Sequence, residues 1–354
     1  MPLARLLAAI AVLACLSAVT ATAAQGAVTT RKAMWGPAEV DGVSQFPIYA
    51  KLGVGIWQTT ISWRDIATRR PAHPTDPTDP AYAWPTQLDE QIVEARRYGI
   101  TVLVSVAGTP TWANGGKDWN FAPSDPADYG AFMAAASRHW PGVRRWLIWG
   151  EPSRAANFSP TGRTGARRYA QLLDSSYAQL KKVSRNNLVI GGNSYTIGDV
   201  RPLDWIRLLR LPNGKPPRMD YYGHNPFTGR TPRLSQPPLG HGYADFGDLD
   251  TLADTIDRNL GRRPGGKKIP IFISELCFPT DHANWEFNIF LSRKVQAQWM
   301  TDVLRVSRTW SRLVTLGYMG LYDFPLRPGN DQVESGLITR EGVRKPAFAA
   351  FARG

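Results

Sequence analysis

The ten residues RRWLIWGEPS, at positions 144–153, join a strongly apolar run to an abrupt polar end. Two tryptophans, a leucine and an isoleucine are followed at once by Gly150, Glu151 and Pro152. A short apolar run bounded by glycine and proline is typical of a buried strand. A carboxylate therefore stands at the carboxyl tip of this predicted strand, where either a surface turn or a catalytic site would account for Glu151.

The rest of the chain repeats the same unit. Short apolar runs alternate with longer segments at helical spacing, such as RRYAQLLDSSYAQLKKV, in which Tyr169, Leu173, Tyr177 and Leu180 share one face. The predicted strands are residues 32–35, 55–62, 101–106, 145–149, 188–191, 219–223, 270–274 and 314–321. Eight strands alternating with helices are compatible with a closed parallel barrel or with a doubly wound sheet.

The strand count and the chain length favour the barrel, and no glycine-rich phosphate loop follows an early strand. We therefore predict an α/β fold, a (β/α)8 TIM barrel, built as a single domain from residues 30–354. The proline-rich residues 70–85 are expected to form a rim loop, and residues 227–247 are a second irregular stretch after the sixth strand. No internal repeat at solenoid or propeller spacing is present.

The first 23 residues are typical of a secretory signal peptide. A short basic start precedes apolar residues 6–20, and Ala21, Thr22 and Ala23 offer a small-residue cleavage site. We therefore expect a secreted, extracellular protein, with a lipid anchor at Cys15 as a minor alternative. Removal of this segment leaves Cys277 alone, so no intramolecular disulfide is expected.

The chain is basic, with 42 Lys and Arg against 29 Asp and Glu, but the charges form no single block. Pairs such as Arg96-Arg97 are scattered through predicted helices and loops, which indicates solvated outer faces. A preference for acidic polysaccharides is the functional alternative. No zinc-finger spacing or RNA-binding motif is present, so nucleic acid is not an expected partner.

A second strand tip carries a carboxylate, because the apolar run KIPIFIS leads directly into Glu275. In a parallel barrel the residues that follow the strands converge on one face. Hydrolysis of a glycosidic bond needs one carboxylic acid to protonate the leaving oxygen and a second carboxylate to attack the anomeric carbon or to activate water. Each glutamate alone could be a solvated turn residue, but their joint occurrence after strands four and seven favours catalysis.

Aromatic side chains surround the same strand ends, and their flat apolar faces suit the faces of sugars. Ordinary packing in the core or barrel wall is the alternative for each tryptophan. The candidate sugar-binding residues of this kind are Trp35, Trp63, Trp112, Tyr322 and, on the sixth strand, Tyr222 with His224.

At this point the sequence resembles the retaining glycoside hydrolases with (β/α)8 barrels, often called clan A. IWGEPS resembles their strand-four motif with the acid/base glutamate, and IFISELCF resembles their strand-seven motif with the nucleophile. DYYGHNPF is similar to the strand-six segment of the β-xylosidase-like branch, which includes family 39. SGLITREGVRKPAFAAF, at positions 335–351, looks like the segment that follows strand eight.

The resemblance implies a retaining glycosidase that acts on a poly- or oligosaccharide. Glu275 would be the nucleophile and Glu151 the acid/base, with carboxyl groups about 5–5.5 Å apart. Tyr222 and His224 would position the nucleophile or the sugar. No cofactor or metal is implied, and a monomer is expected. The loops after strands two, six and seven, with Asp281, His282 and Trp285, would select the sugar and linkage.

One position departs from the family pattern, because Gly150 stands where an asparagine usually precedes the acid/base glutamate. That asparagine binds the 2-hydroxyl of the sugar at the cleavage site. Our hypothesis is that Asn193 or Gln58 takes over this contact. The tryptophan that often ends strand eight also has no match here, since Leu321 and Tyr322 occupy that region.

Other functions fit the sequence less well. GGNSYT resembles a nucleophile elbow, but Thr196 replaces its second glycine. The five histidines form no HExxH helix typical of a zinc enzyme. Cys277 is better explained as a small apolar wall residue than as a nucleophile. A carbohydrate-binding barrel that has lost turnover is the remaining alternative, which Gly150 favours and the retained glutamate pair disfavours.

Overall fold

The computed structural model describes residues 31–263, 265–282, 287, 289–323 and 333–354. The predicted signal peptide at residues 1–23 and the candidate residue Trp285 lie outside these ranges. No helix in the described ranges has both the length and the apolar character that a membrane span requires.

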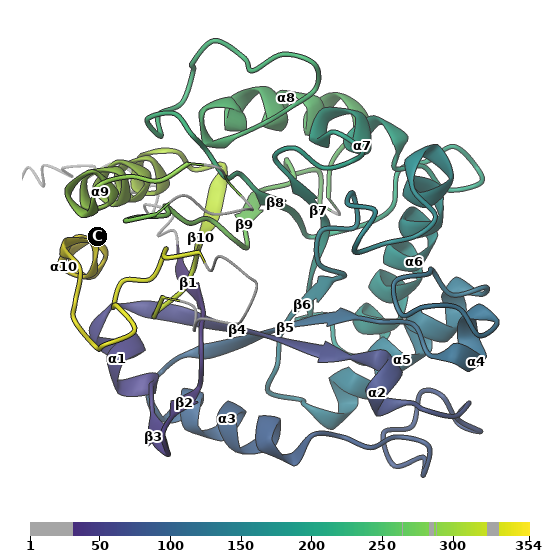
Figure 1. The fold of residues 1–354 in the computed structure, drawn as a ribbon. Helices are drawn as coiled ribbons and strands as arrows, with labels where there is room; N and C mark the ends of the chain where they lie inside the picture. Colours follow the sequence, from purple (N-terminus) through teal and green to yellow (C-terminus); the bar gives the residue numbers. More distant parts are fainter. Residues whose placement is uncertain (1–30, 264, 283–286, 288, 324–332) are drawn as a thin grey trace, which may run out of the picture.

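Within the described residues, eight parallel strands close into one barrel, in the order β1-β10-β9-β8-β7-β6-β5-β4 (Figure 1). The barrel strands are β1 (Arg31–Trp35), β4 (Val54–Ser62), β5 (Thr101–Ala107), β6 (Arg145–Ile148), β7 (Leu188–Tyr195), β8 (Tyr221–Asn225), β9 (Ile271–Ile273) and β10 (Leu313–Met319). The predicted fold class is confirmed, and each predicted strand overlaps an observed one.

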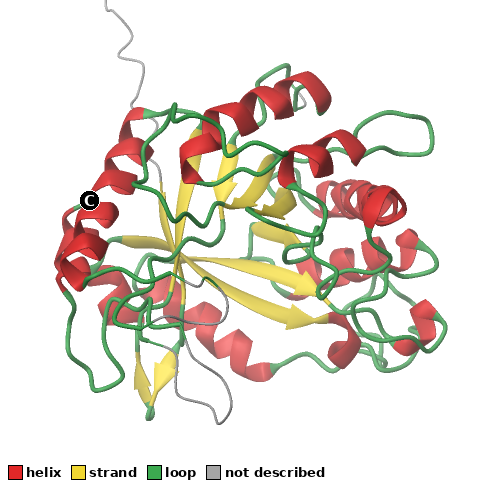
Figure 2. Cartoon of the chain, turned by 45° about the horizontal axis from the view of Figure 1, so that its top comes forward, coloured by secondary structure: helices red, strands yellow, loops and turns green. Residues whose placement is uncertain are grey.

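Helices follow the strands and lie outside the barrel (Figure 2). They are α1 (Phe46–Lys51), α2 (Trp63–Ile66), α3 (Thr86–Arg97), α4 (Thr111–Asn114), α5 (Pro126–His139), α6 (Gly162–Val183), α7 (Pro202–Leu208), α8 (Leu249–Asn259), α9 (Arg293–Thr309) and α10 (Pro346–Arg353). The described residues also form a small hairpin of β2 (Glu39–Val40) and β3 (Val43–Ser44) and the 3-10 turn η1 (Phe246–Asp248). The predicted apolar face of α6 is buried, including Tyr169 and Leu173.

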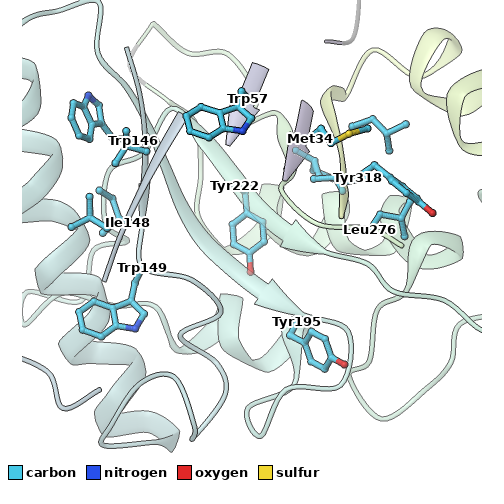
Figure 3. Packing of buried hydrophobic residues seen from close by; sticks show 14 of the residues in the cluster. Met34, Trp57, Trp146, Ile148, Trp149, Tyr195, Tyr222, Leu276 and Tyr318 are labelled. Carbon is cyan, nitrogen blue, oxygen red and sulfur yellow. The ribbon is translucent and has the colours of Figure 1, made fainter. Parts of the chain in front are cut away.

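The strands are apolar on both faces because each face packs against other residues. Inside the barrel, six buried side chains come from six different strands, namely Ala33, Ile56, Leu103, Leu147, Ile190 and Phe272. Trp146 and Ile148, the neighbours of Leu147 on β6, belong instead to the larger cluster between strands and helices, part of which Figure 3 shows. Burial on both faces of β6 explains the continuous apolar run WLIW.

Candidate active site

The two predicted catalytic glutamates stand on the same edge of the barrel, just after β6 and β9. Glu151 is buried, with 7% of its surface exposed, and Glu275 is half-buried. Strands β7 and β8 lie between their strands in the barrel order. The edge where parallel strands end therefore collects the two carboxylates, as the sequence predicts.

The side-chain amide of Asn225, the last residue of β8, links the two glutamates. Its Nδ2 donates a hydrogen bond to Oε1 of Glu151 at 2.8 Å. Its Oδ1 accepts one from the backbone N–H of Glu275 at 3.1 Å and one from the Ser274 hydroxyl at 2.6 Å. An amide is suited to this position because one end donates while the other end accepts.

A second set of contacts holds the other oxygen of Glu151. The Arg154 guanidinium lies 3.1 Å from Oε2, and Nδ2 of Asn157 lies at 3.5 Å. Arg154 also lies over the ring of Tyr195, 4.6 Å from its centroid. The carboxylate of Glu151 is therefore fixed in direction, and a neighbouring cation compensates its charge.

The backbone that carries Glu151 adopts an uncommon conformation. Trp149 and Glu151 have φ of 64° and 45°, in the left-handed region that side chains with a Cβ rarely occupy. The Trp149 amide donates to the Val106 carbonyl at 3.0 Å, and its indole donates to the Asn157 carbonyl at 2.7 Å. Such backbone strain costs roughly 1–3 kcal/mol per residue and is typical of functional sites.

Three predicted substrate-binding residues gather around Ser274, directly before Glu275. The Trp35 indole and the Gln58 amide both donate to the Ser274 carbonyl, at 3.0 and 2.8 Å. The Ser274 hydroxyl lies 2.8 Å from Oδ1 of Asn193. The structure thus brings Trp35, Gln58 and Asn193 together beside the predicted nucleophile.

Two of these side chains keep polar atoms that make no hydrogen bond within the described part of the chain. They are Oε1 of Gln58 and Nδ2 of Asn193, on side chains with 1% and 0% exposure. A buried polar atom without a partner costs about 1–3 kcal/mol, so both atoms are suited to receive a hydroxyl group. An added Cβ at Gly150 would meet no atom within 4 Å. The hypothesis that Asn193 or Gln58 replaces the missing asparagine remains a prediction.

Tyr222 and His224 lie deeper than their predicted role requires, since both are fully buried (Figure 3 shows Tyr222 among apolar side chains). The Ser194 hydroxyl lies 2.9 Å from the Tyr222 hydroxyl and 2.9 Å from Nδ1 of His224. Nε2 of His224 lies 3.0 Å from the Ala244 carbonyl. This burial argues against direct contact with a sugar, and the hydrogen bonds of the two side chains join β8 to β7 and to the loop at Ala244.

The remaining aromatic candidates differ in their surroundings. Trp63 is fully buried against Trp112 and two other rings, so the packing alternative applies to it. Trp112 is half-buried and donates to the Ala67 carbonyl at 2.7 Å. Tyr322 donates to Gln45 at 2.7 Å and lines, with Trp35, a cavity of about 560 Å³ between the ends of β1 and β10.

Sequence reasoning missed Asn225, Ser274, Arg154 and Tyr195. Asn225 follows His224 directly, and Ser274 precedes Glu275, so both stand at strand ends where polar residues were already being sought. Arg154 is three residues after Glu151, a spacing at which side chains meet in a helical turn. No signal in the sequence indicates which of these neighbours points at which glutamate.

Among the described residues, no three His, Cys, Asp or Glu side chains are grouped so that they could hold a metal ion.

Comparisons with known proteins place the fold. No protein-family model and no curated protein matches the chain. Among solved structures, it is similar to a family 39 glycoside hydrolase from Bacteroides cellulosilyticus WH2, with a TM-score of 0.64 and 16% identity over 92% of this chain and 64% of that one. It is also similar to a monomeric β-xylosidase from Caulobacter crescentus CB15, with a TM-score of 0.62 and 16% identity over 92% of this chain and 67% of that one. For a glucosidase from Croceicoccus marinus, the TM-score is 0.61 and the identity 15%, over 92% of this chain and 66% of that one.

The chain thus has the barrel fold of these glycoside hydrolases and spans about two thirds of their length. The resemblance that its motifs indicated is confirmed at the level of the fold.

The Asn225 bridge generates a first prediction, which needs no substrate. Asn225→Asp keeps the acceptor for Ser274 and Glu275 but places a second carboxylate against Oε1 of Glu151. At low pH the pair can share a proton, whereas at neutral pH the two charges repel. In urea unfolding, we expect the free energy of unfolding of the variant to be about 1–3 kcal/mol lower than that of wild type at pH 7. At pH 4.5 the difference should be smaller. Exposed Asn186→Asp is the control, and a deficit independent of pH would contradict the bridge.

The burial of His224 generates a second prediction. Desolvation lowers the pKa of His224 from 6.5 to about 4, so the folded protein keeps this imidazole neutral. Between these values the unfolded chain binds a proton that the folded chain does not, so stability falls as the pH falls from 6.5 to 4. The shift corresponds to about 3 kcal/mol.

We expect His224→Gln to lose less stability than wild type over this pH range, measured by urea unfolding at pH 7, 5.5 and 4.5. Exposed His73→Gln serves as the matched control. Equal pH slopes for wild type and His224→Gln would show that the imidazole does not stay neutral in the fold.

Proposed function

We propose that this protein is a glycoside hydrolase that cleaves O-glycosidic bonds of a poly- or oligosaccharide with retention of configuration. The observation that carries the proposal is the placement of Glu151 and Glu275 at the ends of β6 and β9, with Asn225 contacting both residues. The barrel shared with a family 39 glycoside hydrolase, a β-xylosidase and a glucosidase supports the same class.

In the proposed reaction Glu275 attacks the anomeric carbon, and the bond from that carbon to the leaving oxygen breaks. Glu151 donates its proton to this oxygen, so the leaving group departs as a neutral alcohol. Glu151 then takes a proton from water, whose oxygen attacks the same carbon and displaces Glu275. Two inversions at one carbon give net retention.

The surrounding residues supply orientation. Asn225 and Arg154 fix the direction of the Glu151 carboxylate, and the contacts to Ser274 fix the backbone before Glu275. Trp35 and Tyr322 line the cavity at the ends of β1 and β10, where they could stack on a sugar ring. Secretion, polysaccharide degradation and a monomeric state complete the proposal, and the signal-peptide pattern of residues 1–23 supports the first of these.

A carbohydrate-binding barrel without turnover is the second candidate, and one observation favours it. The Arg154 guanidinium, 3.1 Å from Glu151, stabilises the ionised carboxylate. A binding site tolerates this charge, whereas a general acid must carry a proton before it can act.

The experiment that tests the proposal is reducing-end release from a panel of plant, algal and bacterial polysaccharides. We expect release by wild type and a loss on the order of a thousandfold in both Glu275→Gln and Glu151→Gln. Glu90→Gln, at an exposed position on α3, is the matched control and should retain activity. Binding of a glycan with no release by wild type would favour the second candidate.

A further inference from the structure

A second cleft opens on the same edge of the barrel as the two glutamates. It measures about 460 Å³ and lies between the carboxyl ends of β4 and β5 and the loop that follows α4. Five side chains of interest line it, namely Ser62, Arg64, Asp65, Asp118 and Trp119. A volume of this size is typical of a small-ligand site.

Trp119 differs from the other tryptophans of the described chain, because it alone is exposed, with 45% of its surface accessible. An exposed indole that lines a cleft offers apolar surface to a ligand bound there. Its broad apolar face and N–H donor suit a pyranose ring, which has an apolar face and hydroxyls at its edge.

The loop that carries Trp119 is held in place even though the side chain is exposed. The Trp119 carbonyl accepts from the Thr109 amide at 2.7 Å, and the Asp118 carbonyl accepts from the Asn114 side chain at 2.9 Å. Nη1 of Arg64 donates to the Lys117 carbonyl at 3.1 Å. The indole is therefore presented by a fixed backbone, which lowers the entropic cost of binding.

The charges of the cleft select against an acidic ligand. Asp65 and Asp118 both line it, and the described residues provide no hydrogen bond or ion pair to either carboxylate. Carboxylates accept hydrogen bonds from hydroxyl groups and repel other carboxylates. Arg64 is the one cation among the lining residues, and its Nη1 donates to the Thr109 and Lys117 carbonyls.

The position of the cleft connects it to the candidate active site. Ala107 and Gly108 line it immediately after Val106, which pairs with Ile148 of β6, the strand that leads to Glu151. The cleft therefore lies at the end of the strand next to the one that leads to Glu151.

We propose that this cleft is a sugar-binding subsite for an uncharged pyranose residue of the glycan, separate from the cleavage point. The inference rests on the proposed function and refines it, because a subsite away from the glutamates implies a substrate several sugars long. The subsite also indicates that the sugar bound at this position is neutral. The net positive charge of the chain would instead suggest an acidic polysaccharide.

The test compares binding to three six-residue probes, xylohexaose, cellohexaose and hexagalacturonate, by titration calorimetry in a Glu275→Gln background. We expect at least one neutral probe to bind, and Trp119→Ala to weaken that binding about tenfold. Tyr98→Ala, which removes another exposed aromatic ring after α3, should leave it unchanged. The double variant Asp65→Asn, Asp118→Asn should bind the neutral probe more weakly than the background protein does. Its binding of hexagalacturonate should not be weaker.

Length dependence gives the second readout. Trp119→Ala should weaken binding of the hexasaccharide and should leave binding of the disaccharide of the same sugar unchanged. Equal effects on both lengths, no effect of Trp119→Ala, or tighter binding of hexagalacturonate than of either neutral probe would overturn the inference. If wild type hydrolyses a glycan but Trp119→Ala does not change binding, only the subsite is contradicted. If binding depends on Trp119 but wild type hydrolyses no glycan, only the proposed glycosidase activity is contradicted.

Discussion

The amide of Asn225 is the contact on which the arrangement of the candidate active site depends. It joins Oε1 of Glu151 to the backbone of Glu275 and so connects the ends of β6, β8 and β9. Such a bridge forms only if β8 ends at the same height as its neighbours. The parallel register, with His224 opposite Ile273 and Asn225 opposite Tyr195, fulfils this condition. The geometry of the barrel and the geometry of the candidate active site are thus set together.

The barrel in turn depends on strands that are buried on both sides. Leu147 fills the interior while Trp146 and Ile148 pack under the helices, so a change of register by one residue would exchange the two faces. This constraint fixes where β6 ends and therefore where Glu151 stands. Glu151 itself has a left-handed φ, and its carboxylate accepts a hydrogen bond from Asn225.

The sequence predicts the features that are local and leaves out those that depend on packing between strands. Apolar runs and helical spacing predict all eight strands, and the motifs predict the glutamates at two strand ends. The direction of a side chain near a strand end is not a local property. Trp63 and His224 are therefore buried although they stand at such ends, and Asn225, one residue beyond His224, contacts Glu151. Trp119 escaped attention because it lies in a loop, away from any strand tip.

In the proposed mechanism Glu275 forms a covalent bond to the sugar, and Glu151 donates and accepts the proton. The most direct measurement is peptide mass spectrometry after incubation with an activated 2-deoxy-2-fluoro glycoside of the sugar that the protein releases, a reagent that slows breakdown of the glycosyl-enzyme. We expect one fluoroglycosyl group on the peptide that contains Glu275. An adduct on another carboxylate, or no adduct on a protein that cleaves the parent glycan, would contradict it.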